Sequence, residues 1–180
     1  MAAGLDTNKI SPETTYTDIG FVQIGAQTIK NANGLNYGLS TMTRVLEKSI
    51  NTGAVYVERL IGGDTFRKYV AAFGFDKPAG VDLSGEVSGN LKGIEQNIEI
   101  NYATASFGQG ISVTPLAMVD AIAAIANSGK LMRPYIVQKI VSADGQENLT
   151  QPQVIRQVIS AQAADKLTAM LVSTVRNGYD

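Results

Sequence analysis

Two side chains suited to chemistry, Ser49 and Asn51, stand two positions apart within residues 39–53. A serine hydroxyl and an asparagine amide at the joint between two helices would form a candidate polar site, because both donate and accept hydrogen bonds. The structural alternative is that Ser49 bonds back to its own helix and Asn51 only caps the next one. The local pattern by itself favours this structural alternative.

Two predicted helices must position the pair. Ser40 can cap the first helix, and an apolar stripe with the spacing i, i+3, i+4, i+7 of a core-facing helix follows it. Ser49 takes the last place of the stripe, so we expect its hydroxyl on the buried face. Residues 51–53 break this helix, and Thr52 can cap a second helix that ends at Ile61. The stripe comprises Met42, Val45, Leu46 and Ser49.

The composition limits the chemistry that such a site could perform. The chain has 180 residues, 44% of them hydrophobic, which suffices for a single domain with a sizeable core. It contains no histidine and no cysteine, so a Ser-His-Asp triad, disulfides and zinc thiolate sites are excluded. We expect no metal and no cofactor. Any nucleophile would have to pass its proton to a lysine or a carboxylate.

Charge and hydropathy argue against two classes of partner. The formal net charge of −1 gives no electrostatic case for binding nucleic acid or an anionic membrane surface. No apolar run approaches the roughly 18 residues of a membrane-spanning helix. We therefore expect no nucleic-acid partner and no membrane contact by this segment.

Three further helices are predicted, over residues 64–73, 114–127 and 160–177. Thr114 and Pro115 provide an N-cap followed by proline at the first helical position. The helix that follows is apolar nearly all round, so we expect it at the buried centre of the domain, with Ile122 inside. Ser160 caps the last helix, whose inward residues would be Ala164, Leu167, Leu171 and Val175.

The remaining segments are expected to be strands and loops. Alternating residues between Tyr16 and Lys30 predict a short extended hairpin or two edge strands. A strand over residues 134–142 would pair with one over residues 154–159. Residues 75–97 lack periodicity and are predicted to form a long surface connection, and loops of that length often border sites.

Residues 102–110 are small and uncharged, so we expect them to be buried against another element. This segment ends in Gly108, Gln109 and Gly110. The two glycines lack the third glycine and the acidic residue of a dinucleotide-binding fingerprint, and no Walker lysine follows.

Taken together, three segments resemble the transpeptidase domain of class B penicillin-binding proteins. The resemblance covers nearly the whole chain, and the third segment is specific in length and order. A Ser-x-Asn pattern alone is not specific, because Ser88-Gly89-Asn90 repeats it in a loop without the flanking residues. The matching pieces are Lys48-Ser49-Ile50-Asn51-Thr52-Gly53, then Phe73-Gly74-Phe75 with Val81-Asp82-Leu83-Ser84-Gly85-Glu86, and Ser106-Phe107-Gly108-Gln109-Gly110-Ile111-Ser112-Val113-Thr114-Pro115-Leu116.

The resemblance implies a function in peptidoglycan crosslinking. Such enzymes use three motifs, S-x-x-K, a middle S-x-N or S-D-N, and K-T-G. Ser49 and Asn51 match the middle motif, whose serine relays a proton to the leaving amine and whose asparagine binds the substrate amide. Gly108, Gln109 and Gly110 are then expected to help bind substrate. The implied ligands are peptidoglycan stem peptides and β-lactams, and further partners would be other cell-wall synthesis proteins.

The same resemblance implies a fold and a location. The fold would be mostly α (α+β), namely the helical lobe of the penicillin-binding and serine β-lactamase-like transpeptidase fold. Small peripheral β-hairpins would remain, and most of the central antiparallel sheet would be missing. The complete protein would act at the extracytoplasmic face of the bacterial cytoplasmic membrane.

The chain departs from the family pattern at both ends. No serine stands three residues before any lysine, and no Lys-Ser/Thr-Gly occurs. Residues 1–5 look like the last turn of a helix that starts earlier. We therefore expect residues 1–180 to be the central part of one transpeptidase domain, truncated at both ends and inactive alone. The alternative is a non-catalytic binding or scaffold module that retains only the helical lobe.

Overall fold

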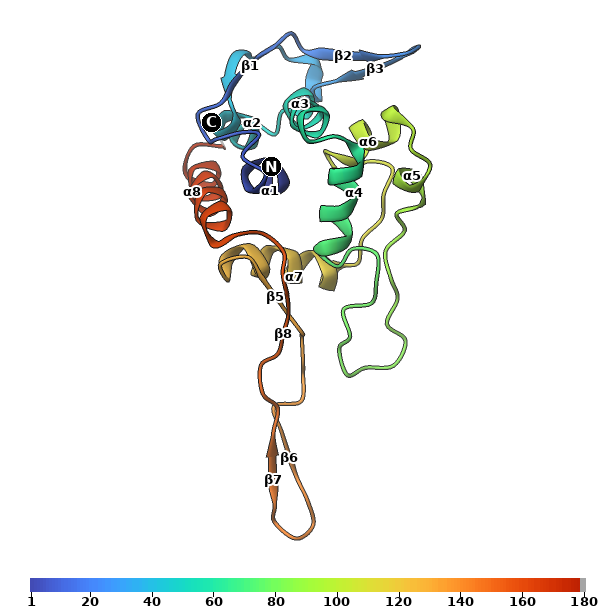
Figure 1. Cartoon of the computed structure of the whole chain (residues 1–180), viewed down its shortest axis with the longest axis vertical. Helices are drawn as coiled ribbons and strands as arrows, with labels where there is room; N and C mark the ends of the chain where they lie inside the picture. Colours follow the sequence, from blue (N-terminus) through green and yellow to red (C-terminus); the bar gives the residue numbers. More distant parts are fainter. Residues whose placement is uncertain (179–180) are drawn as a thin grey trace.

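The computed structural model describes residues 1–178, except for the side chain of residue 33. Helices group around the short α1 (Ala2–Asp6), which contacts α3, α4 and α8. Short strands lie at one end of this group, and a narrow two-stranded arm projects from the other end (Figure 1). The fold is therefore a helical lobe with small peripheral strand pairs, as the sequence predicts.

The helices of the described residues differ widely in length. The joint between α2 and α3 carries Ser49 and Asn51, and the end of α6 carries the second candidate segment. After α1 the helices are α2 (Met42–Glu47), α3 (Asn51–Ile61), α4 (Gly63–Ala72), α5 (Lys92–Glu95), α6 (Glu99–Ala105), α7 (Pro115–Ala126) and α8 (Ala161–Asn177), with a 3-10 turn η1 (Ala32–Gly34).

The described strands form four antiparallel pairs. The pair β2–β3 is a hairpin in which Phe21 lies opposite Lys30, as the alternation predicts. The pair β1–β4 joins segments on either side of that hairpin, with Asp18 opposite Gly38. The strands are β1 (Thr15–Asp18), β2 (Phe21–Ile24), β3 (Gln27–Lys30), β4 (Gly38–Thr41), β5 (Lys130–Met132), β6 (Lys139–Val141), β7 (Glu147–Leu149) and β8 (Val154–Gln157).

The prediction of a strand over residues 134–142 paired with residues 154–159 is wrong in its pairing. β8 pairs with β5, directly after α7, whereas β6 pairs with β7 further out on the arm. The turn at residues 143–145 is short enough to bring β6 back on β7 at once, so β8 is left for the strand nearer the lobe.

The main core lies between α1, α2, α3, α7 and α8. Apolar side chains that are far apart in sequence meet there, and burial of such side chains is the main favourable term in folding. Asp6 adds a polar link in this region, because its carboxylate accepts hydrogen bonds from the Tyr69 hydroxyl (2.5 Å) and the Ser160 backbone N–H (2.7 Å). Core members include Leu5, Met42, Val45, Ile50, Val57, Leu131, Leu167 and Met170.

Two of the predicted helix starts are confirmed. The Thr114 hydroxyl accepts a hydrogen bond from Ala117 N–H with Pro115 at the first helical position, and the Ser160 hydroxyl accepts one from Ala163 N–H. The prediction for Ser40 is wrong, because Ser40 is buried in β4 and Thr41 is the N-cap of α2. In α8 the inward residues include Ala164 and Leu167, but Val175 is exposed.

The expectation that residues 114–127 form the buried centre is wrong. Only the alanine face of α7 is buried, at Ala117, Ala121 and Ala124, where small side chains allow close approach. Ile122 on another face is 51% exposed. Among the described elements, α7 packs most extensively on α8 and β5, which cover one side of a helix that is apolar nearly all round.

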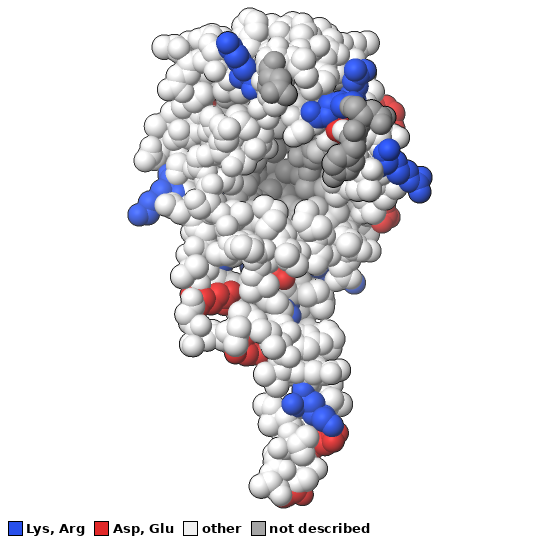
Figure 2. All heavy atoms as spheres, turned by 180° about the vertical axis from the view of Figure 1, so that it is seen from behind, with Lys and Arg blue, Asp and Glu red and all other residues white. Residues whose placement is uncertain are grey.

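The rear face of the lobe carries charged side chains of both signs, separated by broad uncharged areas (Figure 2). The described ion pairs are also on the surface. One of them, between Arg59 and Glu99 at 2.8 Å, joins α3 to α6. Exposed pairs of this kind contribute little to stability, so the lobe depends mainly on its apolar core.

Candidate functional site

A groove of about 290 Å³ brings the two candidate segments together. One wall comes from the joint between α2 and α3 and contains Ser49 and Asn51. Another comes from the end of α6 and contains Ser106 and Phe107. These segments are far apart in sequence and meet because α3 packs on α6. The lining residues are Met1, Val45, Leu46, Ser49, Ile50, Asn51, Ala54, Ser106 and Phe107.

Ser49 lies outside the helix that was expected to contain it. α2 ends at Glu47, and Ser49 adopts the left-handed conformation with φ of 50°. Ser49 N–H donates to Leu46 O (3.2 Å) and Ile50 N–H donates to Val45 O (2.9 Å), the two hydrogen bonds of a Schellman C-cap. Glycine usually occupies this position, so the sequence contained no signal for it.

This conformation places the Ser49 side chain on the surface, at the groove. The prediction of a buried hydroxyl is therefore wrong. The structural alternative, in which the hydroxyl bonds back to its own helix, is also not found among the described residues. Only the backbone of Ser49 bonds to α2, so the hydroxyl remains available to the groove.

Asn51 is the first residue of α3 and does not cap it. Its Nδ2 donates a hydrogen bond of 3.0 Å to the backbone carbonyl of Lys30 at the end of β3. The N-cap of α3 is Ile50, whose side chain cannot accept a hydrogen bond. Thr52, expected to cap the helix, instead lies inside its first turn and is buried.

Only part of the segment of residues 106–110 lies at the groove. Ser106 and Phe107 line the groove, but Gly108, Gln109 and Gly110 do not, and all three are exposed. The expectation of burial holds for Tyr102, Ala103 and Ala105 and is wrong for these last three residues. Gly108, in the turn that follows α6, has φ of 89°, and Gln109 N–H donates to Thr104 O at 3.0 Å. The glycine thus has a structural reason to be there.

No side chain that lines the groove could remove a proton. None of the side chains that line it is ionisable. Glu58, one turn further along α3 than Ala54, lines an adjoining cavity of about 130 Å³ that also touches Ser106. Burial raises the pKa of Glu58, Glu99 raises it further, and Arg59 opposes the shift. The side chains of the groove can therefore bind and orient a polar ligand and relay a proton, but none of them is a base that could activate a nucleophile.

Two buried polar residues that contact the start of α3, Asn31 and Asp18, were missed by sequence reasoning. Asn31 Oδ1 accepts a hydrogen bond of 3.1 Å from the Thr52 backbone N–H, so it satisfies a donor at the start of α3. Asp18 accepts a hydrogen bond of 2.6 Å from the Thr52 hydroxyl. Residues 31–34 carry only turn signals, and no local pattern indicates partners so distant in sequence.

The second Ser-x-Asn pattern has none of these features. Ser88 and Asn90 are exposed. Asn90 Oδ1 accepts a hydrogen bond from the nearby Lys92 N–H at 3.1 Å, a local turn contact. This pattern is therefore separate from the groove.

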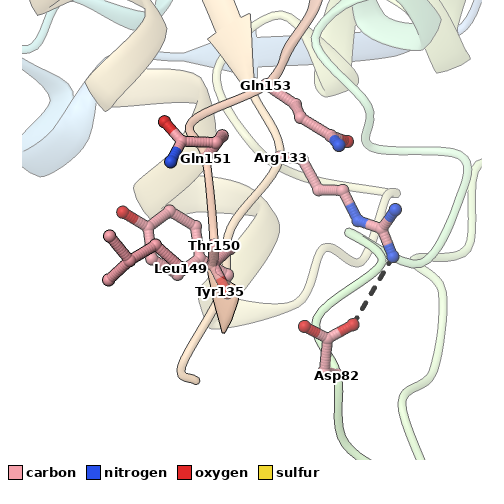
Figure 3. Close-up of a pocket in the computed structure, with 7 residues that line it drawn as sticks. All are labelled: Asp82, Arg133, Tyr135, Leu149, Thr150, Gln151 and Gln153. Carbon is pink, nitrogen blue, oxygen red and sulfur yellow. Dashed lines mark hydrogen bonds and ion pairs between the residues drawn. The ribbon is translucent and has the colours of Figure 1, made fainter. Parts of the chain in front are cut away.

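A larger polar cavity of about 420 Å³ lies at the base of the arm (Figure 3). Arg133 bridges it to the loop of residues 75–97, with Nη2 3.5 Å from an Asp82 carboxylate oxygen and Nε donating to Gly80 O at 3.2 Å. The other lining side chains are those of Tyr135, Leu149, Thr150, Gln151 and Gln153. The contacts of Arg133 hold the arm beside the loop, and neither candidate segment lines this cavity.

The described residues contain no cluster of three or more acidic side chains that could hold a metal ion. Within the same part of the chain, no helix combines the length and the apolar character needed to cross a bilayer.

The fold is a helical lobe with small peripheral strand pairs, and its groove carries a Ser-x-Asn motif at a helix joint. The family described as penicillin binding protein transpeptidase domain matches residues 1–180. The chain belongs to this family.

Curated relatives agree with this assignment. The chain is 34% identical over 140 residues to stage V sporulation protein D of Bacillus subtilis, covering 77% of this chain and 22% of that protein. It is 29% identical over 156 residues to a peptidoglycan D,D-transpeptidase FtsI homolog of Chlorokybus atmophyticus, covering 79% and 23%. The chain thus corresponds to less than a quarter of the length of these relatives.

Solved structures show the same lobe. Penicillin-binding protein 3 of Mycobacterium tuberculosis, complexed with aztreonam, matches with a TM-score of 0.89 and 31% identity, covering 97% of this chain and 39% of that one. The D,D-transpeptidase domain of a peptidoglycan glycosyltransferase from Eggerthella lenta matches with a TM-score of 0.87 and 26% identity, covering 98% and 46%. These matches confirm the predicted fold class.

Proposed function

We propose that residues 1–180 are the central part of a peptidoglycan D,D-transpeptidase that crosslinks stem peptides through a serine acyl-enzyme. The observation that carries this proposal is the shared groove of Ser49, Asn51, Ser106 and Phe107. The groove unites two of the segments that resemble the family, and it presents the Ser49 hydroxyl without a competing hydrogen bond among the described residues.

In the proposed reaction, a serine outside these residues attacks the carbonyl of a D-Ala–D-Ala amide. A lysine beside that serine takes its proton, since the groove contains no ionisable side chain. Ser49 relays a proton to the departing D-Ala amine, which leaves as the acyl-enzyme forms. An amine of a second stem peptide then attacks the acyl-enzyme, releases the serine and completes the crosslink. A β-lactam would acylate the same serine.

Asn51 would bind the amide of the substrate. Lys30 O occupies one of the two Nδ2 hydrogens, so Asn51 retains its Oδ1 acceptor and one hydrogen for a peptide or a β-lactam side chain. Gly108, Gln109 and Gly110 follow directly on the groove residue Phe107, and we propose that this exposed turn contacts the substrate beyond the groove. We place the complete protein at the extracytoplasmic face of the cytoplasmic membrane, where it would meet stem peptides and other cell-wall synthesis proteins.

Labelling with a fluorescent penicillin followed by mass spectrometry tests this function. The 180-residue chain should take up no covalent label, because it contains no S-x-x-K motif to supply the nucleophile and its lysine. A protein that contains these residues together with an S-x-x-K and a K-T-G motif should take up one label, on the serine of S-x-x-K. Absence of label from that longer protein would contradict the proposal and support a scaffold role. A stoichiometric adduct on the 180-residue chain would refute its predicted inactivity.

A further inference from the structure

The Asp18 carboxylate, 1% exposed, is held by four neutral hydrogen-bond donors. Oδ1 accepts from the Thr52 hydroxyl at 2.6 Å and from Gly20 N–H at 2.9 Å. Oδ2 accepts from Asn31 Nδ2 and from Tyr37 N–H, both at 2.8 Å. A buried carboxylate is costly unless its charge is compensated, and these four donors supply that compensation.

Asp18 fixes the orientation of the Asn31 amide. Asn31 Nδ2 donates to Asp18 and also to Leu35 O at 3.0 Å, so both amide hydrogens are used. Asn31 Oδ1 must then face the opposite way, where it accepts from the Thr52 backbone N–H. Because α3 has no side-chain cap of its own, this contact secures the first turn of the helix from outside.

The same network reaches both partners of the Asn51 contact. Thr52 follows Asn51 in the chain, and it is bound to Asp18 through its hydroxyl and to Asn31 through its N–H. Lys30, whose carbonyl accepts from Asn51 Nδ2, immediately precedes Asn31. A change at Asp18 would therefore displace the donor and the acceptor of this hydrogen bond relative to each other.

We propose that Asp18 is a positioning residue that sets the geometry of the Asn51 side chain through Thr52 and Asn31, without itself touching the groove. The importance of this role for catalysis rests on the proposed function, but the positioning itself does not. Asp18 lies in β1 and is absent from the lining of the groove.

The ionisation state of Asp18 fits this role. Burial by itself would raise its pKa, but the hydrogen bonds from Thr52, Tyr37, Gly20 and Asn31 together lower the pKa of this carboxyl. The carboxylate is therefore charged at neutral pH and can accept all four bonds. The titratable side chains that line a cavity with it are Tyr16, Tyr56 and Arg59. Burial raises the pKa of Tyr16 to about 12, so Tyr16 stays protonated.

The experiment uses NMR on the 180-residue chain and follows two signals, the side-chain amide of Asn51 and the hydrogen exchange of Thr52 N–H. Asp18→Asn keeps the shape but presents an amide to four donors. Thr52→Val removes the hydroxyl that donates to Asp18 and is also hydrogen-bonded to the Tyr16 hydroxyl at 3.2 Å. In both variants, the side-chain amide signal of Asn51 should lose the chemical shift of an amide that is hydrogen-bonded to the Lys30 carbonyl. Both should also speed the hydrogen exchange of the backbone N–H at position 52 by about tenfold or more, the effect of losing roughly one buried hydrogen bond.

Two variants serve as matched controls. Thr52→Ser retains the hydroxyl and should restore the wild-type signals. Asp82→Asn makes the same chemical change at the exposed ion pair beside the arm and should leave both signals unchanged. If Asp18→Asn does not fold, the comparison of Thr52→Val with Thr52→Ser decides the question.

An unchanged Asn51 amide signal and unchanged exchange of the N–H at position 52, in a folded Asp18→Asn or Thr52→Val variant, would overturn the proposal. Equal changes in Thr52→Ser and Thr52→Val would also overturn it, because side-chain shape rather than the hydroxyl would then be responsible. These signals report the geometry of Asn51 and not acylation. The positioning role can therefore fail while the transpeptidase function holds, and the transpeptidase function can fail while the positioning role holds.

Discussion

Asn51 and Lys30 are joined by a hydrogen bond of 3.0 Å from the asparagine Nδ2 to the lysine backbone carbonyl, although 21 positions separate them in the chain. The asparagine at the start of α3 is thereby held by the end of β3. A backbone carbonyl is a fixed acceptor that no side-chain rotation can withdraw. The groove thus has one member whose orientation is set by the fold before any ligand arrives.

The left-handed conformation of Ser49 gives a prediction about stability. Ser49→Ala removes an exposed hydroxyl and should change the free energy of unfolding by less than about 1 kcal/mol. Ser49→Gly removes the same hydroxyl but also relieves the strain of a side chain at positive φ, so it should be more stable than Ser49→Ala by about 1 kcal/mol. Urea unfolding measures the difference. An alanine variant as stable as the glycine variant would show that the C-cap is unstrained.

The core gives a second prediction, because two apolar residues of neighbouring helices differ in burial. Leu167 in α8 is 4% exposed, and Leu167→Ala should lower the free energy of unfolding by about 2–5 kcal/mol through the cavity it leaves. Ile122→Ala, on the uncovered side of α7, should cost less than about 1 kcal/mol. Urea midpoints of the two variants provide the comparison. A larger loss for Ile122→Ala would mean that α7 is covered on that side.

A third prediction concerns pH and the buried Glu58, which is 5% exposed. Its raised pKa means that the folded chain binds the proton more tightly than the unfolded chain. The stability linked to Glu58 is therefore present at low pH and is lost as the pH rises above the unfolded value of about 4.3. Glu58→Gln cannot ionise, so it should be more stable than wild type by about 1 kcal/mol at pH 7 and nearly equal to it at pH 4.

Denaturant unfolding at the two pH values measures this effect, and Glu13→Gln at an exposed turn is the matched control. This control makes the same chemical change at an exposed position, so the effect of Glu58→Gln is compared with that of Glu13→Gln at each pH value. A Glu58→Gln variant that is less stable than wild type at pH 7 would show that the carboxylate is compensated in the folded chain.

Much of the fold could be predicted because its signals are local. Thr114-Pro115 and Ser160 mark helix starts through their own hydroxyls, and Gly74 with φ of 87° marks a helix end. Burial could not be predicted in the same way. The sequence of α7 is apolar nearly all round, and only tertiary contacts determine that its alanines face inward while Ile122 does not.

The site was predicted in part. The resemblance identified Ser49 and Asn51, and Ser106 and Phe107, from another segment that carries the resemblance, line the same groove. The backbone of Ser49 was predicted wrongly because helical spacing was extended past the end of α2, where a serine occupies the usual place of glycine. The supporting residues Asp18 and Asn31 could not be found, since their partners are set by tertiary structure.

The rate of acylation tests the central claim, that Ser49 of the groove relays a proton, most directly. The second-order rate constant for a fluorescent penicillin should be measured in a protein that contains residues 1–180 with both outer motifs. Ser88→Ala, in the other Ser-x-Asn pattern, is the matched control. Ser49→Ala should slow acylation by about 10²-fold or more, the usual scale for a proton-transfer group, while Ser88→Ala retains the wild-type rate. Equal rates for Ser49→Ala and wild type would contradict the account.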